Sequence, residues 1–294
     1  MQDILWRIEY GLVRCVFFLV RLFPLGFWCF PARMLGCFGF FVLAKRRRDA
    51  LANLRLISGN DADEHALNRI ACRSCQHLVY AYLEFIHCTR SREKVKTYGA
   101  FTAAEQKTLD GYYGRRKGLM YLTAHIGNWE FLSLIAGVSG FPLTSIGRAV
   151  KNPYLTQYVN RLRSITGSAI IDKKDAVRGT LDVLRKKECL GTLVDQRGGD
   201  SGIVIQFMGQ PASATPFPAL MKLRFDCALV PIFCIRERVG KFSFVIGDEI
   251  VVPPGVTDKD EIIRSVTQAY TDEIEKVVRR YPEQWLWFHR RWRL

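Results

Sequence analysis

Several features that would narrow the function of a 294-residue chain are missing from this sequence. No uninterrupted apolar run reaches the ~20 residues that a clean membrane-spanning helix needs. Within the most apolar part of the chain, residues 11–44, the longest charge-free stretches, 22–32 and 34–44, have eleven residues each. There is no G-x-S-x-G nucleophile elbow, and the glycines Gly198 and Gly199 lack the Lys-Ser/Thr of a P-loop. The sequence therefore argues against a serine hydrolase built on that elbow and against P-loop nucleotide binding.

A disulfide framework is also missing. The nine cysteines are an odd number with no regular spacing, which is typical of reduced thiols in core positions and of a cytosolic environment. Cys72 and Cys75 form a CxxC motif near His77 and Cys88, but the spacing matches no standard zinc or haem pattern. We expect this stretch to be a core helix, and we expect no metal.

Acidic residues are scarce relative to basic ones. The chain has 43 Lys and Arg against 28 Asp and Glu, a net charge of +15, and this excess calls for an anionic partner. Composition alone does not choose between nucleic acid, an acidic protein and an anionic bilayer surface. The sequence contains no RNP-like, zinc-finger or helix-turn-helix signature, so we expect no binding of nucleic acid.

The N-terminal part is the most apolar, and it is interrupted by charges and prolines. Arg7, Arg14 and Arg21 recur every seven residues, which places them on one stripe of a helix predicted over 4–23. This pattern is typical of an interfacial helix with snorkelling arginines, and a short tilted span is the alternative. No small-residue cleavage site follows the apolar core, so we expect the segment to remain on the mature protein.

A basic cluster, Lys45-Arg46-Arg47-Arg48, follows a second predicted apolar helix. Such clusters beside a membrane segment mark the cytoplasmic side and bind anionic head groups, and a merely solvated face is the alternative. We therefore predict a membrane-anchoring unit over 1–48 and a catalytic domain over 49–294.

From residue 49 onward, short apolar runs alternate with stretches of helical periodicity. This alternation predicts an α/β fold, a mixed sheet flanked by helices, with an N-terminal apolar helical membrane anchor. The expected strands are 118–124, 142–147, 168–171, 189–194, 228–235 and 242–247. The expected helices are 49–57, 64–88, 128–138, 153–166, 175–187, 216–225 and 258–280.

One string combines residues suited to acid–base chemistry. His125 follows the predicted strand 118–124, Gly127 permits a tight turn, and Asn128 is a natural N-cap for the next helix. Ligand sites in α/β sheets favour such strand ends. Glu130 lies in the first helical turn, where we expect its carboxylate to reach back toward His125. A histidine oriented by a carboxylate makes a general base near neutral pH, although such a pair is often only structural.

The string HIGNWE, residues 125–130, resembles the HX4(D/E) motif of the lysophospholipid and glycerolipid acyltransferase superfamily. Its filling residues are similar to those of the bacterial lipid A biosynthesis (lauroyl/myristoyl) acyltransferases. Further blocks in the same order strengthen this resemblance along roughly the whole chain. These blocks are Arg148 with Asn152-Pro153, Asp195-Gln196, FMGQPASATPFPALMKL (207–223), ALVPIFCIRE (228–237) and PEQWLWFHRRWR (282–293).

The resemblance implies a metal-independent and cofactor-independent acyl transfer at the cytoplasmic face of the bacterial inner membrane. The donor would be an acyl-carrier-protein thioester and the acceptor a hydroxyl of a lipid A precursor. His125 would be the general base and Glu130 its partner. The remaining matched residues would bind substrate or support the site, with Arg148 on a phosphate or the oxyanion. These residues are Arg148, Asn152, Asp195 and Gln196.

Alternatives remain open at this point. The same machinery could acylate another bacterial glycolipid or phospholipid, including mannosides, or take acyl-CoA as donor. A basic membrane-surface protein without chemistry would also explain the charge and the aromatic residues. The C-terminal Trp285, Trp287 and Trp292 fit either a membrane interface or ordinary core packing.

Overall fold

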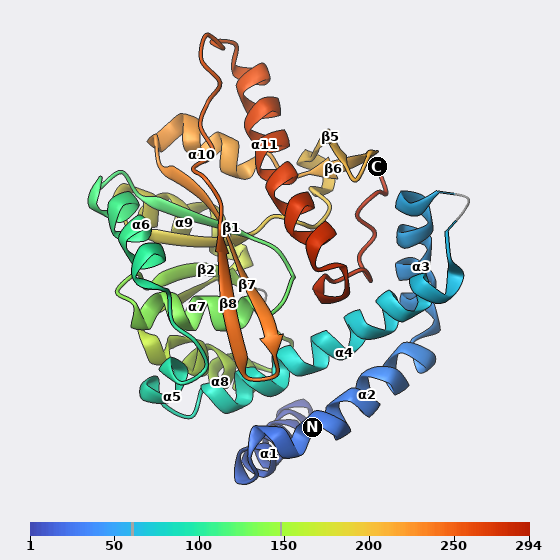
Figure 1. Cartoon of the computed structure of the whole chain (residues 1–294). Helices are drawn as coiled ribbons and strands as arrows, with labels where there is room; N and C mark the ends of the chain where they lie inside the picture. The colour runs from blue at the N-terminus through green and yellow to red at the C-terminus, as the bar shows by residue number, and fades with distance from the viewer. Residues whose placement is uncertain (60–61, 148) are drawn as a thin grey trace.

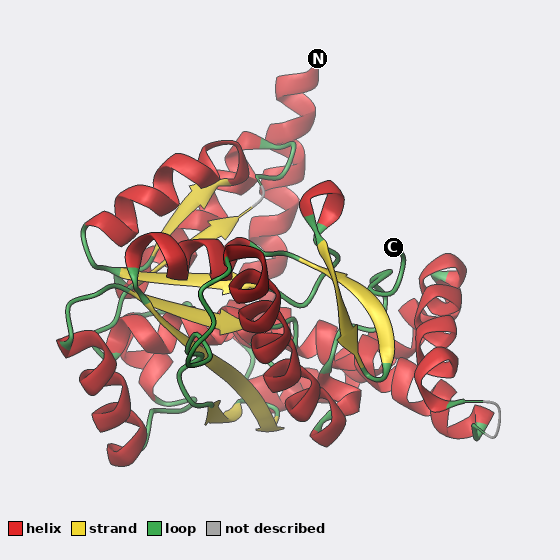
Figure 2. Ribbon diagram, turned by 90° about the horizontal axis from the view of Figure 1, so that it is seen from above, coloured by secondary structure: helices red, strands yellow, loops and turns green. Residues whose placement is uncertain are grey.

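The computed structural model describes residues 1–59, 62–147 and 149–294. Its centre is a six-stranded sheet with helices on both faces (Figure 2). The strands are β1 (Leu119–Thr123), β2 (Leu143–Gly147), β3 (Ala169–Asp172), β4 (Cys189–Leu193), β7 (Ala228–Arg238) and β8 (Lys241–Ile246). Their order in the sheet is β3-β2-β4-β1-β7-β8, and only β8 runs antiparallel to its neighbour. The predicted mixed α/β sheet and its six strands are confirmed.

The helices surround this sheet in the order expected from the sequence (Figure 1). They are α1 (Gln2–Leu22), α2 (Cys29–Val42), α3 (Ala44–Ser58), α4 (Glu64–Cys88), α5 (Arg92–Lys96), α6 (Ala103–Gly114), α7 (Trp129–Val138), α8 (Pro153–Arg163), α9 (Ala176–Arg185), α10 (Phe217–Phe225) and α11 (Lys259–Arg280). The short helices α5 and α6 were not predicted, because neither carries a pronounced apolar stripe.

A hairpin was also missing from the prediction. Strands β5 (Ile203–Phe207) and β6 (Gln210–Ala214) form a separate two-stranded sheet that packs on α11. The two strands are joined by a tight turn at Met208 and Gly209, and both residues have the positive φ that such a turn requires. Glycine is common at such positions, but methionine is not a turn signal.

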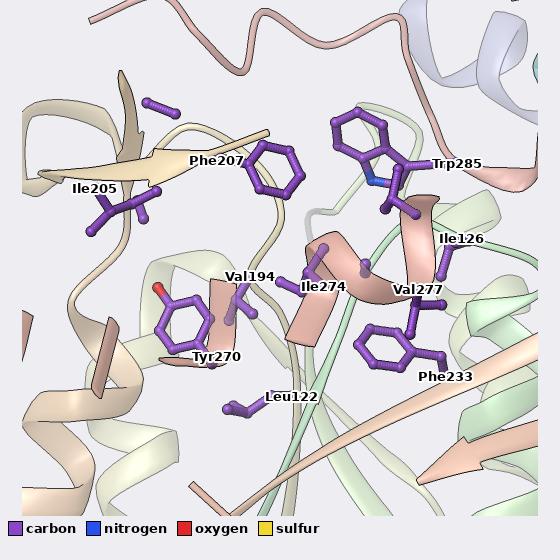
Figure 3. Close-up of a cluster of buried hydrophobic side chains, with 14 of the residues drawn as sticks. Leu122, Ile126, Val194, Ile205, Phe207, Phe233, Tyr270, Ile274, Val277 and Trp285 are labelled. Carbon is purple, nitrogen blue, oxygen red and sulfur yellow. The ribbon is translucent and has the colours of Figure 1, made fainter. Parts of the chain in front are cut away.

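Strand β1 is buried on both faces, as is usual for a central parallel strand. Leu119 and Tyr121 point into the core that contains α7, whereas Met120 and Leu122 point into the core that contains α11. Figure 3 shows part of the second core, in which Leu122 lies near side chains of α11. Because β1 is enclosed by both layers, the residue that follows it has a fixed position.

Helix α2 lies lengthwise beside α4 (Figure 1). Ala32, Gly36 and Phe40 recur every four residues and form its buried face. A Cβ on Gly36 would lie 2.6 Å from the Cα of Gln76, so glycine permits this close helix approach. By length and composition, one helical segment of the described chain, Leu25–Val42, is apolar enough to cross a membrane.

The predicted boundary at residue 48 lies inside α3. The basic cluster 45–48 is the exposed first turn of this helix, whose later residues Ala50, Leu51 and Leu54 belong to the main core. The N-terminal segment therefore continues into the rest of the protein through a rigid helix.

Of the arginine stripe of α1, Arg21 is half-buried against the end of α4, whereas Arg7 and Arg14 are exposed, so the expected snorkelling stays a prediction. Arg21 donates to the carbonyl oxygens of Ile86 and Thr89 at 2.9 and 3.1 Å. Arg7 and Arg14 lie over the rings of tyrosines of α8 and of α1 itself. Val20 is buried and Phe17 is half-buried against the rest of the protein, whereas eight large apolar side chains of α1 are exposed. They are Ile4, Leu5, Ile8, Leu12, Val16, Phe18, Leu19 and Leu22.

Candidate active site

His125 is the second residue after β1, at the carboxyl end of the sheet, and begins a tight turn that leads into α7. Gly127 has φ +59°, and a Cβ there would lie 1.9 Å from the carbonyl oxygen of Cys234. Only glycine fits this turn. Asn128 caps α7 by accepting a hydrogen bond from the Phe131 amide at 3.0 Å, as the sequence predicted.

The carboxylate that contacts His125 belongs to Asp195. Its Oδ1 lies 2.9 Å from Nδ1 of the imidazole, and its Oδ2 accepts the His125 backbone N–H at 2.9 Å. Both residues follow neighbouring parallel strands, β1 and β4, and this adjacency brings them together across 70 positions of sequence. The Asp195 side chain is 2% exposed and that of His125 is 18% exposed, so the ring retains one accessible edge.

The C-terminal segment completes this arrangement. Trp285 donates its indole N–H to Asp195 Oδ2 at 2.9 Å. The same segment pairs with the turn, because the Leu286 amide donates to the His125 carbonyl at 3.0 Å and the Gly127 amide donates to the Gln284 carbonyl at 3.1 Å. Three donors thus hold the carboxylate, two from His125 and one from Trp285.

These contacts shift the pKa values of the two side chains in opposite directions. Burial raises the pKa of the Asp195 carboxyl, but the charge of His125 and the N–H donors lower it, and the resulting pKa is about 2. Burial lowers the pKa of His125, whereas the charge and hydrogen bond of Asp195, and then the charge of Glu130, raise it; the net pKa lies above 6.5. Because Asp195 is ionised at neutral pH, Nδ1 of the neutral ring carries the proton and Nε2 is the basic nitrogen.

Glu130 does not make the contact with His125 that the sequence predicted. Its carboxylate forms a two-point ion pair with Arg163 at the end of α8, including a 2.8 Å bond from Nε to Oε2. As the second residue of α7, Glu130 projects from the helix toward α8. Asp195, and not the nearby Glu130, is therefore the carboxylate that contacts His125. Glu130 raises the pKa of the imidazole through its charge.

Gln196 lies beside the imidazole of His125. Its Nε2 is 3.4 Å from Nδ1 and 3.5 Å from Nε2 of His125. Gln196 also lines a cavity of about 320 Å³ between α2, α3, α4 and the C-terminal segment. Most of its wall is apolar, including Phe40, Leu43 and Leu78, while Arg46, Arg47 and His289 add polar groups.

Two other predicted site residues have different outcomes. Asn152 caps α8, and its Nδ2 donates to the Trp6 carbonyl and to Glu9 Oε2 at 2.8 and 2.9 Å. Since Asn152 is 2% exposed, its side chain joins α8 to α1 and has no free edge for a substrate. Arg148 lies outside the described residues.

Several residues of the site were missed or assigned less precisely by sequence reasoning. Trp285 and Trp287 are 1% exposed, so core packing is the correct interpretation for both (Figure 3 shows Trp285). Arg291 is fully buried and donates from Nη1 to the Gln196 carbonyl at 2.8 Å. Sequence reasoning also missed Glu84 and Arg236. Each lies within a strongly apolar run, and this position indicates a buried charge.

Comparison with known proteins identifies relatives of this chain. Residues 4–294 match the family described as bacterial lipid A biosynthesis acyltransferase. The lipid A biosynthesis lauroyltransferase of Escherichia coli K12 is 26% identical over 187 residues, 61% of this chain and 57% of that protein. A phosphatidylinositol mannoside acyltransferase of Mycolicibacterium smegmatis is 21% identical over 182 residues, 60% of this chain and 57% of that protein. These matches span less than two thirds of either relative's own length.

The charge of Asp195 predicts the titration of His125. We expect its imidazole to titrate above 6.5 and to titrate below 6.5 in Asp195→Asn, because this change removes the negative charge and leaves the burial. Proton NMR of the five histidines measures this, with His125 assigned by the signal lost in His125→Gln. Asp226→Asn, at an exposed ion pair, is the matched control. An unchanged pKa in Asp195→Asn would contradict the assigned contact.

Proposed function

The chain belongs to the family of bacterial lipid A biosynthesis acyltransferases, and on this premise we propose that it transfers a fatty acyl chain from an acyl-carrier-protein thioester to a hydroxyl of a lipid A precursor. The observation that carries the proposal is the contact of His125 with Asp195 at one accessible end of a buried strand. A histidine held in this tautomer is suited to deprotonate a hydroxyl.

The proposed reaction is direct. His125 Nε2 takes the proton of the acceptor hydroxyl while the hydroxyl oxygen attacks the thioester carbonyl. The tetrahedral intermediate then expels the carrier thiolate as its C–S bond breaks, and the imidazolium returns the proton to the sulfur. Asp195 stabilises the imidazolium between these steps. Gln196, whose amide lies 3.5 Å from Nε2, is suited to donate a hydrogen bond to the substrate oxygen.

Glu130 remains a proposed catalytic residue in a changed role. Its negative charge raises the pKa of His125 and its ion pair holds Arg163 near the site. A substrate-binding role of Arg148 also remains a proposal. The reaction needs no metal or cofactor as written, because the thioester is already activated.

The cavity beside Gln196 supports an acyl substrate. Its volume of about 320 Å³ lies at the lower end of the range of ~300–1,000 Å³ for ligand pockets. Its wall is mainly apolar, which suits a hydrocarbon chain, and Arg46 and Arg47 supply cations that suit an anionic group attached to the chain.

The exposed faces of α1 and α2 support attachment to a membrane surface. Phe18 on α1 and Phe38 on α2 are 67% and 64% exposed, and both belong to outward faces made of large apolar side chains. Since α2 is packed lengthwise on α4, we propose that it lies in the bilayer interface and does not cross the bilayer. Exposed Arg33, Lys45 and Arg48 suit anionic head groups. The net charge of +15 favours such a surface on the cytoplasmic face of the inner membrane.

The acceptor is the least constrained part of the proposal. One relative is named a phosphatidylinositol mannoside acyltransferase, so another bacterial glycolipid or a phospholipid is the second candidate acceptor. Acyl-CoA is the second candidate donor.

Acyl transfer from labelled acyl carrier protein to a purified lipid A precursor tests the function. We expect His125→Ala and Asp195→Asn to lower the rate by roughly 10²–10⁴-fold, the usual contribution of general-base catalysis. Glu130→Gln should cost less than Asp195→Asn, because it removes a charge and leaves the imidazole hydrogen bond in place.

Circular dichroism serves as the folding control for these variants. Full activity of His125→Ala would rule out the direct general-base mechanism. A greater loss of rate in Glu130→Gln than in Asp195→Asn would show that Glu130 is the principal carboxylate partner of His125. Transfer by the wild type only to other glycolipids, or only from acyl-CoA, would select the second acceptor or donor.

The cavity predicts a change in chain-length preference. At Gly39 a Cβ would make only an ordinary 3.5 Å contact with the Cys75 sulfur, so Gly39→Leu should fold and reduce the space. We expect this variant to favour shorter acyl donors, as judged by kcat/KM across a donor series. Gly111→Leu, at an open position of α6, is the matched control. An unchanged ranking of donors in Gly39→Leu would show that the acyl chain does not bind in this cavity.

The outward apolar faces predict binding to lipid vesicles. The double variant Leu12→Glu, Phe38→Glu should sediment with anionic phosphatidylglycerol vesicles much less than the wild type, because two charges would enter the apolar layer. Val177→Glu adds a charge at a 72% exposed apolar residue of α9 and should leave binding unchanged. Equal loss in both variants would show that net charge alone governs binding.

A further inference from the structure

The turn after His125 is held on its other side by a buried ion pair. Glu84 of α4 and Arg236 of β7 are joined by two hydrogen bonds, Nε to Oε1 at 2.7 Å and Nη2 to Oε2 at 2.6 Å. Their side chains are 0% and 2% exposed. Neither residue reaches the imidazole, so neither belongs to the acid–base machinery described above.

Both members of the pair also contact the turn itself. Glu84 Oε2 accepts a hydrogen bond from Asn128 Nδ2 at 2.8 Å, and Arg236 Nη2 lies 3.4 Å from the Gly127 carbonyl oxygen. The Asn128 amide donates to the carbonyl of Cys234, two residues before Arg236. The pair therefore fixes the two residues that set the direction of the chain between His125 and α7.

Arg236 also holds the C-terminal side of the turn. The Gln284 side chain exchanges two hydrogen bonds of 2.9 Å with the backbone amide and carbonyl of Arg236. The backbone carbonyl of Gln284 in turn accepts the Gly127 amide. One arginine thus links α4, β7, the turn and the segment that carries Trp285.

The third guanidinium nitrogen of Arg236 is also engaged. His77 Nδ1 lies 2.6 Å from Arg236 Nη1. Burial, and then the charges of Arg236 and Arg73, lower the pKa of His77 to about 3, so the ring is neutral at physiological pH and accepts this bond. The network is completed by the Gly240 amide, which donates to Glu84 Oε1 at 3.1 Å.

A buried ion pair is a poor source of stability, because desolvation of both charges offsets their attraction and a well-packed apolar pair is often as stable. Its distinctive property is fixed geometry, since the planar guanidinium holds several acceptors at defined angles. A displacement of about 1 Å at a reacting group can cost roughly 100-fold in rate. Precision at the turn is therefore the property that this pair supplies.

We infer that Glu84 and Arg236 are positioning residues that fix the Gly127–Asn128 turn and thereby aim the His125 imidazole at its substrate. The link to catalysis rests on the proposed function, whereas the effect on the turn does not. Both charges must be removed together in the test, because a single neutral substitution would leave an unpaired buried charge.

The test compares the wild-type chain with the double variant Glu84→Leu, Arg236→Met. We expect the folded variant to lose roughly 10- to 100-fold in kcat, with KM for the acyl donor within about twofold. Hydrogen exchange at the Gly127 and Asn128 amides should become about tenfold faster, and the pKa of His125 should fall toward that of Asp195→Asn. The control is Arg55→Met, Glu64→Leu, which removes an exposed two-point pair and should change none of these quantities.

Folding is checked by circular dichroism and thermal unfolding. A folded double variant with wild-type kcat, exchange and His125 pKa overturns the inference, even if its Tm is lower, because a purely structural role predicts that result. If the double variant does not fold, Arg236→Lys carries the test by the same criteria, since lysine keeps the charge but cannot hold four acceptors. If the wild type transfers no acyl chain, the exchange and pKa measurements still decide the positioning role while the proposed function fails.

Discussion

The buried carboxylate of Asp195 joins three parts of the chain that are distant in sequence. It receives the side chain and the backbone amide of His125 at the end of β1, and the indole of Trp285 from the C-terminal segment. A buried carboxylate without such donors would be strongly destabilising, so these segments must assemble for the charge to be tolerated. The same requirement orients the imidazole. Stability and the proposed chemistry therefore depend on one set of hydrogen bonds, and the Glu84–Arg236 pair supports that set from the opposite side of the turn.

The sequence predicted the fold far better than the pairing within the site. Apolar runs bounded by turns located the strands of the sheet, and they placed His125 at a strand end. The order of strands was not readable from one sequence, and only that order places Asp195 beside His125. Proximity in sequence favoured Glu130, but the direction of its side chain from α7 leads to Arg163. Arg21 shows the same limit, because the sequence does not reveal that it meets carbonyls near the end of α4 while Arg7 and Arg14 of the same stripe are exposed.

Helix α1 exposes more large apolar side chains than an amphipathic helix on a soluble protein usually does. Arg21 binds carbonyls of the same chain and Val20 packs inward, while eight large apolar side chains meet the surroundings. Exposed apolar area of this extent on a soluble protein marks an interaction surface. The outward apolar side chains suit an apolar partner, and a bilayer interface supplies one along both helices.

Helix α2 connects this face with the interior. One side of it packs on α4 through Ala32 and Gly36, another lines the cavity through Gly39, and a third is exposed through Phe38. If a bilayer covers the exposed side, the cavity lies just above the head groups, with Gln196 between it and the imidazole. Under the proposed function, a lipid acceptor could then keep its own chains in the bilayer and present only its hydroxyl to His125. The protein would need to enclose the single chain being transferred, which agrees with a cavity of about 320 Å³ rather than a broad cleft.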